Sequence, residues 1–207
     1  MISPSQSASE PCPELIKRLL DVLANDVLPL TEAAVKTGNK IFGAALLRKS
    51  DFSTYLVETN NEIESPLHHG EMHLLKRYFE IPAQERASAD ELIFLSSHEP
   101  CSMCLSAITW SGFDNFYYFF SHEESRDEFA IPHDLNILQE VFDLKPGQYR
   151  KDNKFWRCHS IMGWCHNEAP ETMRDQLQQT ADSLRARYST ISNQYQESKD
   201  INSIPLN

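Results

Sequence analysis

Two short segments of the chain carry the residues best suited to chemistry. The first is the tripeptide His-Gly-Glu at positions 69–71, and the second contains Cys101 and Cys104, directly after Pro100. Two cysteines three positions apart in the first turn of a helix lie on one face, close enough to bind a single metal ion. The positive end of that helix stabilises thiolates, and a proline fits its first turn. The second segment therefore indicates a metal site at the start of a helix.

His69 can supply a third ligand to the same ion, while Glu71 can lie beside the ion rather than on it. Three protein ligands leave tetrahedral zinc one open position for water, as in catalytic zinc sites. A neighbouring carboxylate can then take a proton from that water and deliver it to a substrate. Two alternatives remain open for the cysteines alone, namely a thiol redox pair or two buried structural residues. A structural zinc site would want a fourth protein ligand and would have no need of Glu71.

The elements that must position these residues alternate between helix and strand. Apolar periodicity and turn residues predict the following elements: a helix over 13–28 that Pro29 ends, a short helix over 31–37, strands over 41–47 and 54–57, a helix over 69–79, a strand over 91–96, a helix over 100–110, a strand over 116–120 and helices over 134–142 and after Pro170. Residues 155–164 are aromatic and show no clear pattern. Strands separated by helices predict an α/β layered domain.

The segment after Pro170 carries one apolar seam at helical spacing. Its members are Met173, Leu177, Ala181, Leu184, Tyr188, Ile191 and Tyr195. Such a seam packs either on the domain's own core or against another chain. We therefore divide the chain into a flexible, Pro/Ser-rich tail (1–12), an α/β domain (13–166) and a C-terminal helical extension (167–207).

Composition limits the possible environments and partners. The 207 residues suit one domain, and 41% of them are hydrophobic, as in a folded globular protein. The formal net charge of −11 and the lack of basic tracts argue against a nucleic-acid partner or an anionic membrane. There is no apolar run long enough to span a membrane, and the first residues do not read as a signal peptide. We therefore expect a cytoplasmic protein whose five cysteines serve metal or thiol chemistry.

In the order in which they occur, the two segments form the pattern H-x-E followed by P-C-x-x-C. This is the signature of zinc-dependent deaminases, and residues 41–127 resemble the cytidine deaminase-like superfamily. The resemblance includes Phe-Gly-Ala-Ala at 42–45 and a stretch at 99–110 that looks most like guanine deaminases and tRNA adenosine deaminases. It implies a three-layer α/β/α sandwich around a mixed five-stranded sheet, here with a long C-terminal helix. It also implies Zn²⁺ held by His69, Cys101 and Cys104, with Glu71 as the catalytic acid and base.

The same resemblance implies a set of substrate contacts, each with a plainer alternative. Asn60 or Asn61 falls where the family places an asparagine that binds the base, although either can be a turn residue. Phe42 and Trp110 line the pocket or pack in the core, and Glu124 (or Asp127) contacts substrate or is a solvated surface charge. The chain departs from the family at Gly70, where alanine is usual, and at His68, where a small residue is common. These two departures alter the pocket wall rather than the ligands.

The resemblance implies hydrolytic removal of an exocyclic amine from a nucleobase or nucleoside, with release of ammonia. We expect the substrate to be guanine or another purine, with cytosine or cytidine as the next candidates. The alternatives are a tRNA adenosine deaminase, or a non-catalytic zinc-binding interaction protein. The expected partners are a small heterocyclic amine, water and a second copy of the chain. We interpret the doublets Cys158-His159 and Cys165-His166 as packed side chains, although a second metal site is conceivable.

Overall fold

The computed structural model of the protein describes residues 10–145, 148–201 and 204–206. Of the tail predicted for 1–12, residues 1–9 therefore lie outside the described residues. Five strands form one mixed sheet in the order β2-β1-β3-β4-β5. The central antiparallel pairs are β1 (Gly43–Arg48) with β2 (Thr54–Thr59) and with β3 (Leu92–His98). The strands β4 (Asn115–Phe120) and β5 (Arg157–Ser160) continue the sheet in parallel.

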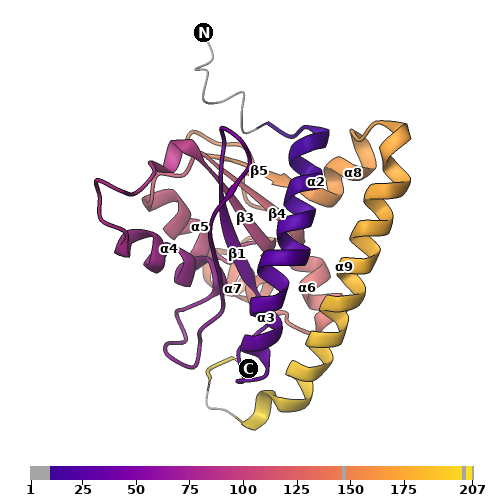
Figure 1. Ribbon diagram of the computed structural model, residues 1–207. Coiled ribbons are helices and arrows are strands. Elements are labelled where there is room, and N and C mark those ends of the chain that lie inside the picture. The colour runs from indigo at the N-terminus through magenta and orange to yellow at the C-terminus, as the bar shows by residue number, and fades with distance from the viewer. Residues whose placement is uncertain (1–9, 146–147, 202–203, 207) are drawn as a thin grey trace.

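Helices cover both faces of this sheet, as Figure 1 shows. One face carries α2 (Pro13–Val22), the π-helical turn η1 (Leu23–Val27), α3 (Leu28–Val35), α8 (Ile161–Asn167) and α9 (Glu171–Ser198). The other face carries α4 (Gly70–Glu80) and α5 (Ser102–Trp110). Two further helices, α6 (His122–Phe129) and α7 (His133–Phe142), lie between β4 and β5 in the sequence, and short 3₁₀ turns occupy Ala89–Glu91 (η2) and Lys199–Ile201 (η3). The predicted α/β sandwich with a mixed five-stranded sheet is confirmed.

Two hydrophobic cores lie on opposite faces of the sheet. Successive side chains of a strand point to opposite faces, so Ala45 and Leu47 of β1 join the core under α2 and α9. Ala44 and Leu46 of the same strand join the core under α4 and α5. This division explains why β1 reads as a continuous apolar run in the sequence, since a strand covered on both sides has no polar face.

The first helix differs from the prediction, which ended it at Pro29. The helical path continues, because the π-helical turn η1 precedes the proline and α3 starts at Leu28 with Pro29 in its first turn. Proline is tolerated there, since a first-turn N–H has no partner within its own helix. Helix α3 therefore reaches as far as Val35.

The apolar seam of α9 packs on the domain's own core. Six of its seven members, Leu177, Ala181, Leu184, Tyr188, Ile191 and Tyr195, are buried in the core that also holds α2, and Met173 packs against it. Contacts of α9 with α2, α3, α6 and α8 run along the helix (Figure 1). Of the two alternatives for this seam, the structure supports packing within the chain. Within the described residues, no helix is both long and apolar enough to cross a bilayer.

Candidate active site

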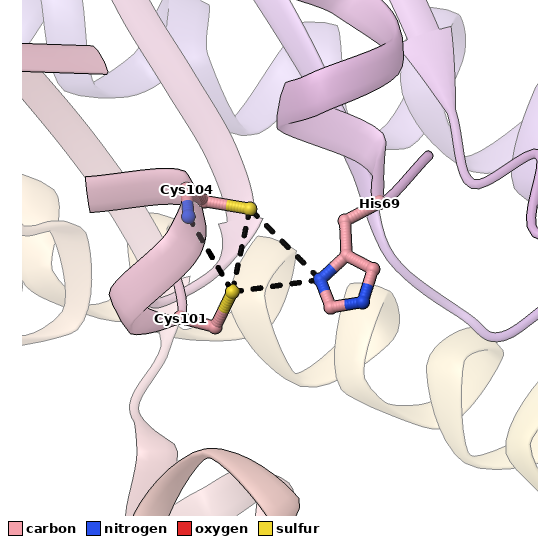
Figure 2. Close-up of side chains that lie close together, drawn as sticks. All are labelled: His69, Cys101 and Cys104. Atoms are coloured by element: carbon pink, nitrogen blue, oxygen red, sulfur yellow. Dashed lines mark hydrogen bonds between the residues drawn. The ribbon is translucent and has the colours of Figure 1, made fainter. Parts of the chain in front are cut away.

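The predicted metal ligands lie at the N-termini of two helices that meet beside the sheet. His69 is the N-cap residue of α4, and Cys101 is the N-cap residue of α5, whose sulfur accepts a hydrogen bond from the backbone N–H of Cys104. Figure 2 shows the imidazole of His69 facing both sulfur atoms. The positive ends of two helices thus point toward one small volume, which favours thiolate there.

The distances among the three side chains fit a zinc ion. The sulfur atoms of Cys101 and Cys104 lie 3.5 Å apart, and Nδ1 of His69 lies 3.5 Å and 3.9 Å from them. Tetrahedral zinc with ordinary Zn–S and Zn–N bonds separates such ligand atoms by about 3.5–3.8 Å. Within the described part of the chain, this is the one group of three or more such side chains arranged to hold a metal ion. The donor set, one imidazole and two thiols, is one that zinc prefers.

Glu71 lies beside this cluster without belonging to it. Its side chain is buried on the first turn of α4, where one carboxylate oxygen accepts a 2.6 Å hydrogen bond from the hydroxyl of Ser96. The other oxygen lies 3.4 Å from the sulfur of Cys104. Burial raises the pKa of the Glu71 carboxyl, and the charge of Cys101 adds to this effect. A buried carboxylate fixed by one hydrogen bond next to three ligands is placed to exchange protons with a water at the fourth position.

The protonation of the ligands themselves is set by their mutual contacts. Burial acts to lower the pKa of His69, but its hydrogen bond to Cys101 and the negative charges of Cys101, Glu71 and Glu62 raise it to about 9. Hydrogen bonding from Cys104 and the contact with His69 hold the pKa of Cys101 well below its usual range. Burial raises the pKa of the Cys104 thiol. Near neutral pH the metal-free site therefore keeps a proton on His69 and another on Cys104.

We expect zinc uptake to release about two protons per ion near neutral pH, since ligands must be deprotonated to bind. Because the pKa values of His69 and of the Cys104 thiol are both raised, the affinity for zinc should climb with pH throughout the neutral range. Titration calorimetry in buffers of different ionisation enthalpy counts the released protons. An affinity that stays flat between about pH 6 and pH 8 would contradict this protonation scheme.

The structure explains why glycine stands between His69 and Glu71. A Cβ atom built on Gly70 would lie 2.8 Å from the Cα atom of Gly43 in β1, closer than real Cβ contacts. The backbone N–H of Gly70 also donates a hydrogen bond to Oδ1 of Asn60. The start of α4 is thus pressed directly onto the backbone of β1, and this contact fixes the two functional residues on either side.

We expect Gly70→Ala to destabilise the protein by about 1–3 kcal/mol, because the neighbour that must yield is backbone rather than a flexible side chain. Urea denaturation of the zinc-loaded variant measures the change. Gly163→Ala is the comparison, because its Cβ would meet the side chain of Ser160 at 3.1 Å, a milder contact. Equal stability losses in the two variants would show that the contact with Gly43 is not tight.

A cavity of about 230 Å³ opens beside His69 and Cys101. Its walls are mainly apolar. They come from the residues just before β1, the loop before α4, the start of α5, the first half of α7 with the residues before it, and the C-terminal segment. The lining residues are Lys40, Phe42, Glu62, Pro66, Leu67, His69, Cys101, Ser102, Met103, Ile131, His133, Asp134, Ile137, Pro205 and Leu206. The volume and walls suit a flat heterocycle placed next to the metal ligands.

The predicted substrate contacts fall in different places. Phe42 lines the cavity. Asn60 is buried beside it, where its amide nitrogen donates to Glu62. Asn61 donates instead to Glu64, and it is not among the cavity-lining residues.

Two other predicted contacts lie outside this cavity. Trp110 is 91% exposed at the end of α5, so it neither lines the cavity nor packs in the core. Glu124 belongs to the capping box of α6 and forms an ion pair with Arg185 of α9. Asp127 pairs with its neighbour Arg126 on the surface. Two acidic residues do line the cavity, Glu62 and Asp134. Asp134 lies in the first turn of α7, and burial raises its pKa to about 7.

The sequence analysis did not find three of the polar groups in the cavity, namely Lys40, Glu62 and His133. Asp134 was identified only as a helix-start residue. Lys40 precedes an apolar strand and Glu62 lies in a polar loop, so each resembles an ordinary surface charge. The one sequence signal that could have identified Lys40 and Glu62 is their position next to elements already assigned to the site.

The remaining histidines and cysteines do not extend the metal site. His68 and His73 stack on each other, and Nδ1 of His73 lies 2.9 Å from the carbonyl oxygen of Thr59. Cys165 is part of the core under α9, whereas Cys158 packs against the core on the opposite face. The two Cys-His doublets therefore cannot share an ion.

Comparison with known proteins agrees with this geometry. Residues 21–120 match the family described as the cytidine and deoxycytidylate deaminase zinc-binding region. This region belongs to the cytidine and deoxycytidylate deaminase family. It contains all three predicted zinc ligands and Glu71. The deaminase family identified here is thus the one to which the sequence pattern pointed.

Three solved structures resemble the chain, and the first of them, with a TM-score above 0.5, shares its fold. A mutant of the protein NE0047 in complex with 8-azaguanine is 15% identical, with a TM-score of 0.51, covering 88% of this chain and 94% of that one. A guanine deaminase from Nitrosomonas europaea is 15% identical, with a TM-score of 0.49, over 86% and 95% of the two chains. A tRNA:A34 deaminase is 20% identical, with a TM-score of 0.44, over 64% and 93%. No curated protein matches the chain in sequence.

Proposed function

We propose that the protein is a zinc-dependent hydrolytic deaminase that removes the exocyclic amine of a nucleobase or nucleoside, guanine or another purine first and cytosine or cytidine next. The observation that carries the proposal is the buried carboxylate of Glu71 next to a cluster of three metal ligands. A redox dithiol would not need this carboxylate, and a purely structural zinc site would want a fourth protein ligand in its place.

His69, Cys101 and Cys104 would hold the ion. Zinc bound there would act as a Lewis acid and lower the pKa of a water at its open position. Glu71 takes a proton from the attacking water and passes it to the ring nitrogen next to the carbon that bears the amine. The carbon–oxygen bond forms, and Glu71 then takes the second proton, from the hydroxyl now on that carbon, and gives it to the amine. The carbon–nitrogen bond breaks, which releases ammonia and leaves a carbonyl group on the ring. Ser96 holds Glu71 in position through its 2.6 Å hydrogen bond.

The choice of substrate rests on the cavity. Phe42 and the aliphatic side chains around it offer flat apolar walls for an aromatic ring. A protein of the same fold binds the purine analogue 8-azaguanine. The net charge of −11 disfavours tRNA as the substrate, because an RNA stem needs cationic contacts. A homodimer and a cytoplasmic location remain part of this proposal.

An ammonia-release assay tests the proposal. The zinc-loaded chain is incubated with guanine, cytosine, adenine, their nucleosides and pterins, and the products are identified by mass. Release of ammonia together with the corresponding oxo product supports the proposal. Stoichiometric zinc without turnover of any of these compounds would instead favour a non-catalytic zinc-binding protein.

A further inference from the structure

A buried ion pair lies in the wall of the cavity. Nζ of Lys40 is 2.8 Å from a carboxylate oxygen of Glu62, and the two side chains are only 5% and 1% exposed. Glu62 is also held by the side-chain amide of Asn60 at 2.8 Å and by the backbone N–H of Lys40 at 3.3 Å. Because its partners fix it on several sides, the carboxylate holds the Lys40 ammonium in one place.

The pair adjoins the candidate metal centre. Nε2 of His69 lies 3.8 Å from the same Glu62 oxygen that binds Lys40, while Nδ1 of His69 faces the sulfurs. The Glu62 carboxylate thus stands between the His69 imidazole and the Lys40 ammonium. A ring whose amine faces the metal ligands therefore presents another of its edges toward Lys40.

Lys40 has hydrogen-bonding capacity that the described part of the chain does not use. An ammonium group has three donors, and among the described residues Nζ of Lys40 forms one side-chain hydrogen bond, to Glu62. Among the described residues that line the cavity, Lys40 is the only lysine or arginine. Burying a charge with unused donors is costly unless a ligand or water meets them. Among the described residues, the other donors of the Lys40 ammonium thus have no acceptor, and an oxygen of a bound substrate would provide one.

We propose that Lys40, held in place by Glu62, is a specificity-determining residue that donates a hydrogen bond to a carbonyl oxygen on the substrate ring. The inference rests on the proposed deaminase function and narrows its substrate class to amino-heterocycles that also bear an oxo group, such as guanine and cytosine. Adenine, which has the amine but no oxo group, is then a poor substrate. The charge of Lys40 also reaches across the cavity, since it adds to burial in lowering the pKa of His133.

Pairs of compounds that differ by one oxygen test this assignment. Guanine is compared with 2-aminopurine, and cytosine with 4-aminopyrimidine, in wild type and in Lys40→Met. Hydrogen bonds to a charged group change an equilibrium by about 10- to 100-fold, so the wild type should prefer the oxo compound and Lys40→Met should lose about that much of the preference. The ratio of kcat/KM within one variant is independent of how much protein is active, and the loss should lie mainly in KM.

Two further variants keep the test interpretable. Lys40→Met leaves the Glu62 carboxylate buried without its ion partner, which can unfold the chain; the double variant Lys40→Met with Glu62→Gln removes both charges and keeps an amide for Asn60. Lys49→Met is the matched control, because Lys49 is also buried and pairs with Asp114 at 2.8 Å, but at the other end of β1. The control should keep the wild-type preference for the oxo compound.

The possible outcomes separate the inference from the proposed function. If wild type deaminates these compounds and Lys40→Met or the double variant keeps the full oxo preference, the inference is overturned and the function stands. If wild type deaminates none of them, titration calorimetry with the same pairs on zinc-loaded protein replaces the kinetic ratio. Oxo-selective binding that disappears in the Lys40 variants supports the inference without turnover. Binding of none of the four compounds overturns the inference, and the ammonia-release assay on the wider set of compounds then decides the function by itself.

Discussion

Replacing Glu71 with glutamine is expected to leave one zinc bound per chain and to lower turnover by a factor of about 10²–10⁴, the usual contribution of a general acid and base. Glutamine keeps the size of the side chain and can still accept the hydrogen bond from Ser96. It cannot carry the proton from water to the ring and on to the leaving amine. Metal analysis gives the zinc content per chain, and the rate of ammonia release from the same preparation gives the turnover.

The matched control for this variant is Glu58→Gln. Glu58 is also an ion-paired glutamate with a largely covered side chain, but it contacts Arg77 and His73 on the outer side of α4. Its replacement should leave turnover within about twofold, the scatter expected of a surface charge change. Full activity in Glu71→Gln would remove the carboxylate from the mechanism, and loss of zinc in that variant would show that Glu71 is itself a ligand.

Replacing Cys104 with alanine is expected to weaken zinc binding by about 10²–10³-fold and to abolish measurable turnover. A site of this kind binds with about 10–16 kcal/mol in total, so each of a few ligands supplies several kcal/mol. Cys104 is buried and has no exposed surface through which a replacement ligand could enter. A chelator competition with a chromophoric indicator measures the affinity of each variant.

Cys165→Ala provides the comparison, because Cys165 is a buried cysteine of one of the Cys-His doublets. It packs in the core under α9 rather than near the three ligands. The variant should bind one zinc with wild-type affinity and lose only a modest amount of stability. A second zinc equivalent in wild type that disappears in Cys165→Ala would contradict the assignment of the doublets to packing.

The centre of the site could be predicted from sequence because each of its two motifs is short. Cys101 and Cys104 share one helical turn, so helix geometry predicts that their sulfurs lie on one face, whereas the grouping of His69 and Glu71 with them came from the resemblance to zinc-dependent deaminases. The helix starts were also marked by proline and by polar residues after strands. Residues 41–127 therefore supplied both the fold class and the metal ligands.

The substrate cavity could not be predicted because its partners are distant in sequence. Lys40 and Glu62 are 22 positions apart, and neither residue type reveals that the pair is buried. Asp134 was recognised only as a helix start, since nothing local tells that α7 folds over the cavity. Trp110 was predicted to line the pocket or to pack in the core, but it is exposed. A resemblance along one helix does not determine which other elements cover the end of that helix.

Two short elements were missed for a different reason. Strand β5 has four residues, too few for a period of two to be visible, and it gains its place by parallel pairing with β4. Helix α6 is mostly charged, and its capping box between Ser121 and Glu124 marks its start more clearly than any apolar stripe. Pairing and capping, rather than periodicity, define these elements.

Helix α9 and the segment after it contribute both to the hydrophobic core and to the cavity. It seals the core on the face opposite α4 and α5, and the segment that follows it places Pro205 and Leu206 in the wall of the cavity. Deleting all residues after Pro170 would therefore expose the core on that face of the sheet and would also remove part of the cavity wall. A truncated chain would therefore not separate a loss of stability from a loss of substrate binding. Single substitutions can separate these two effects.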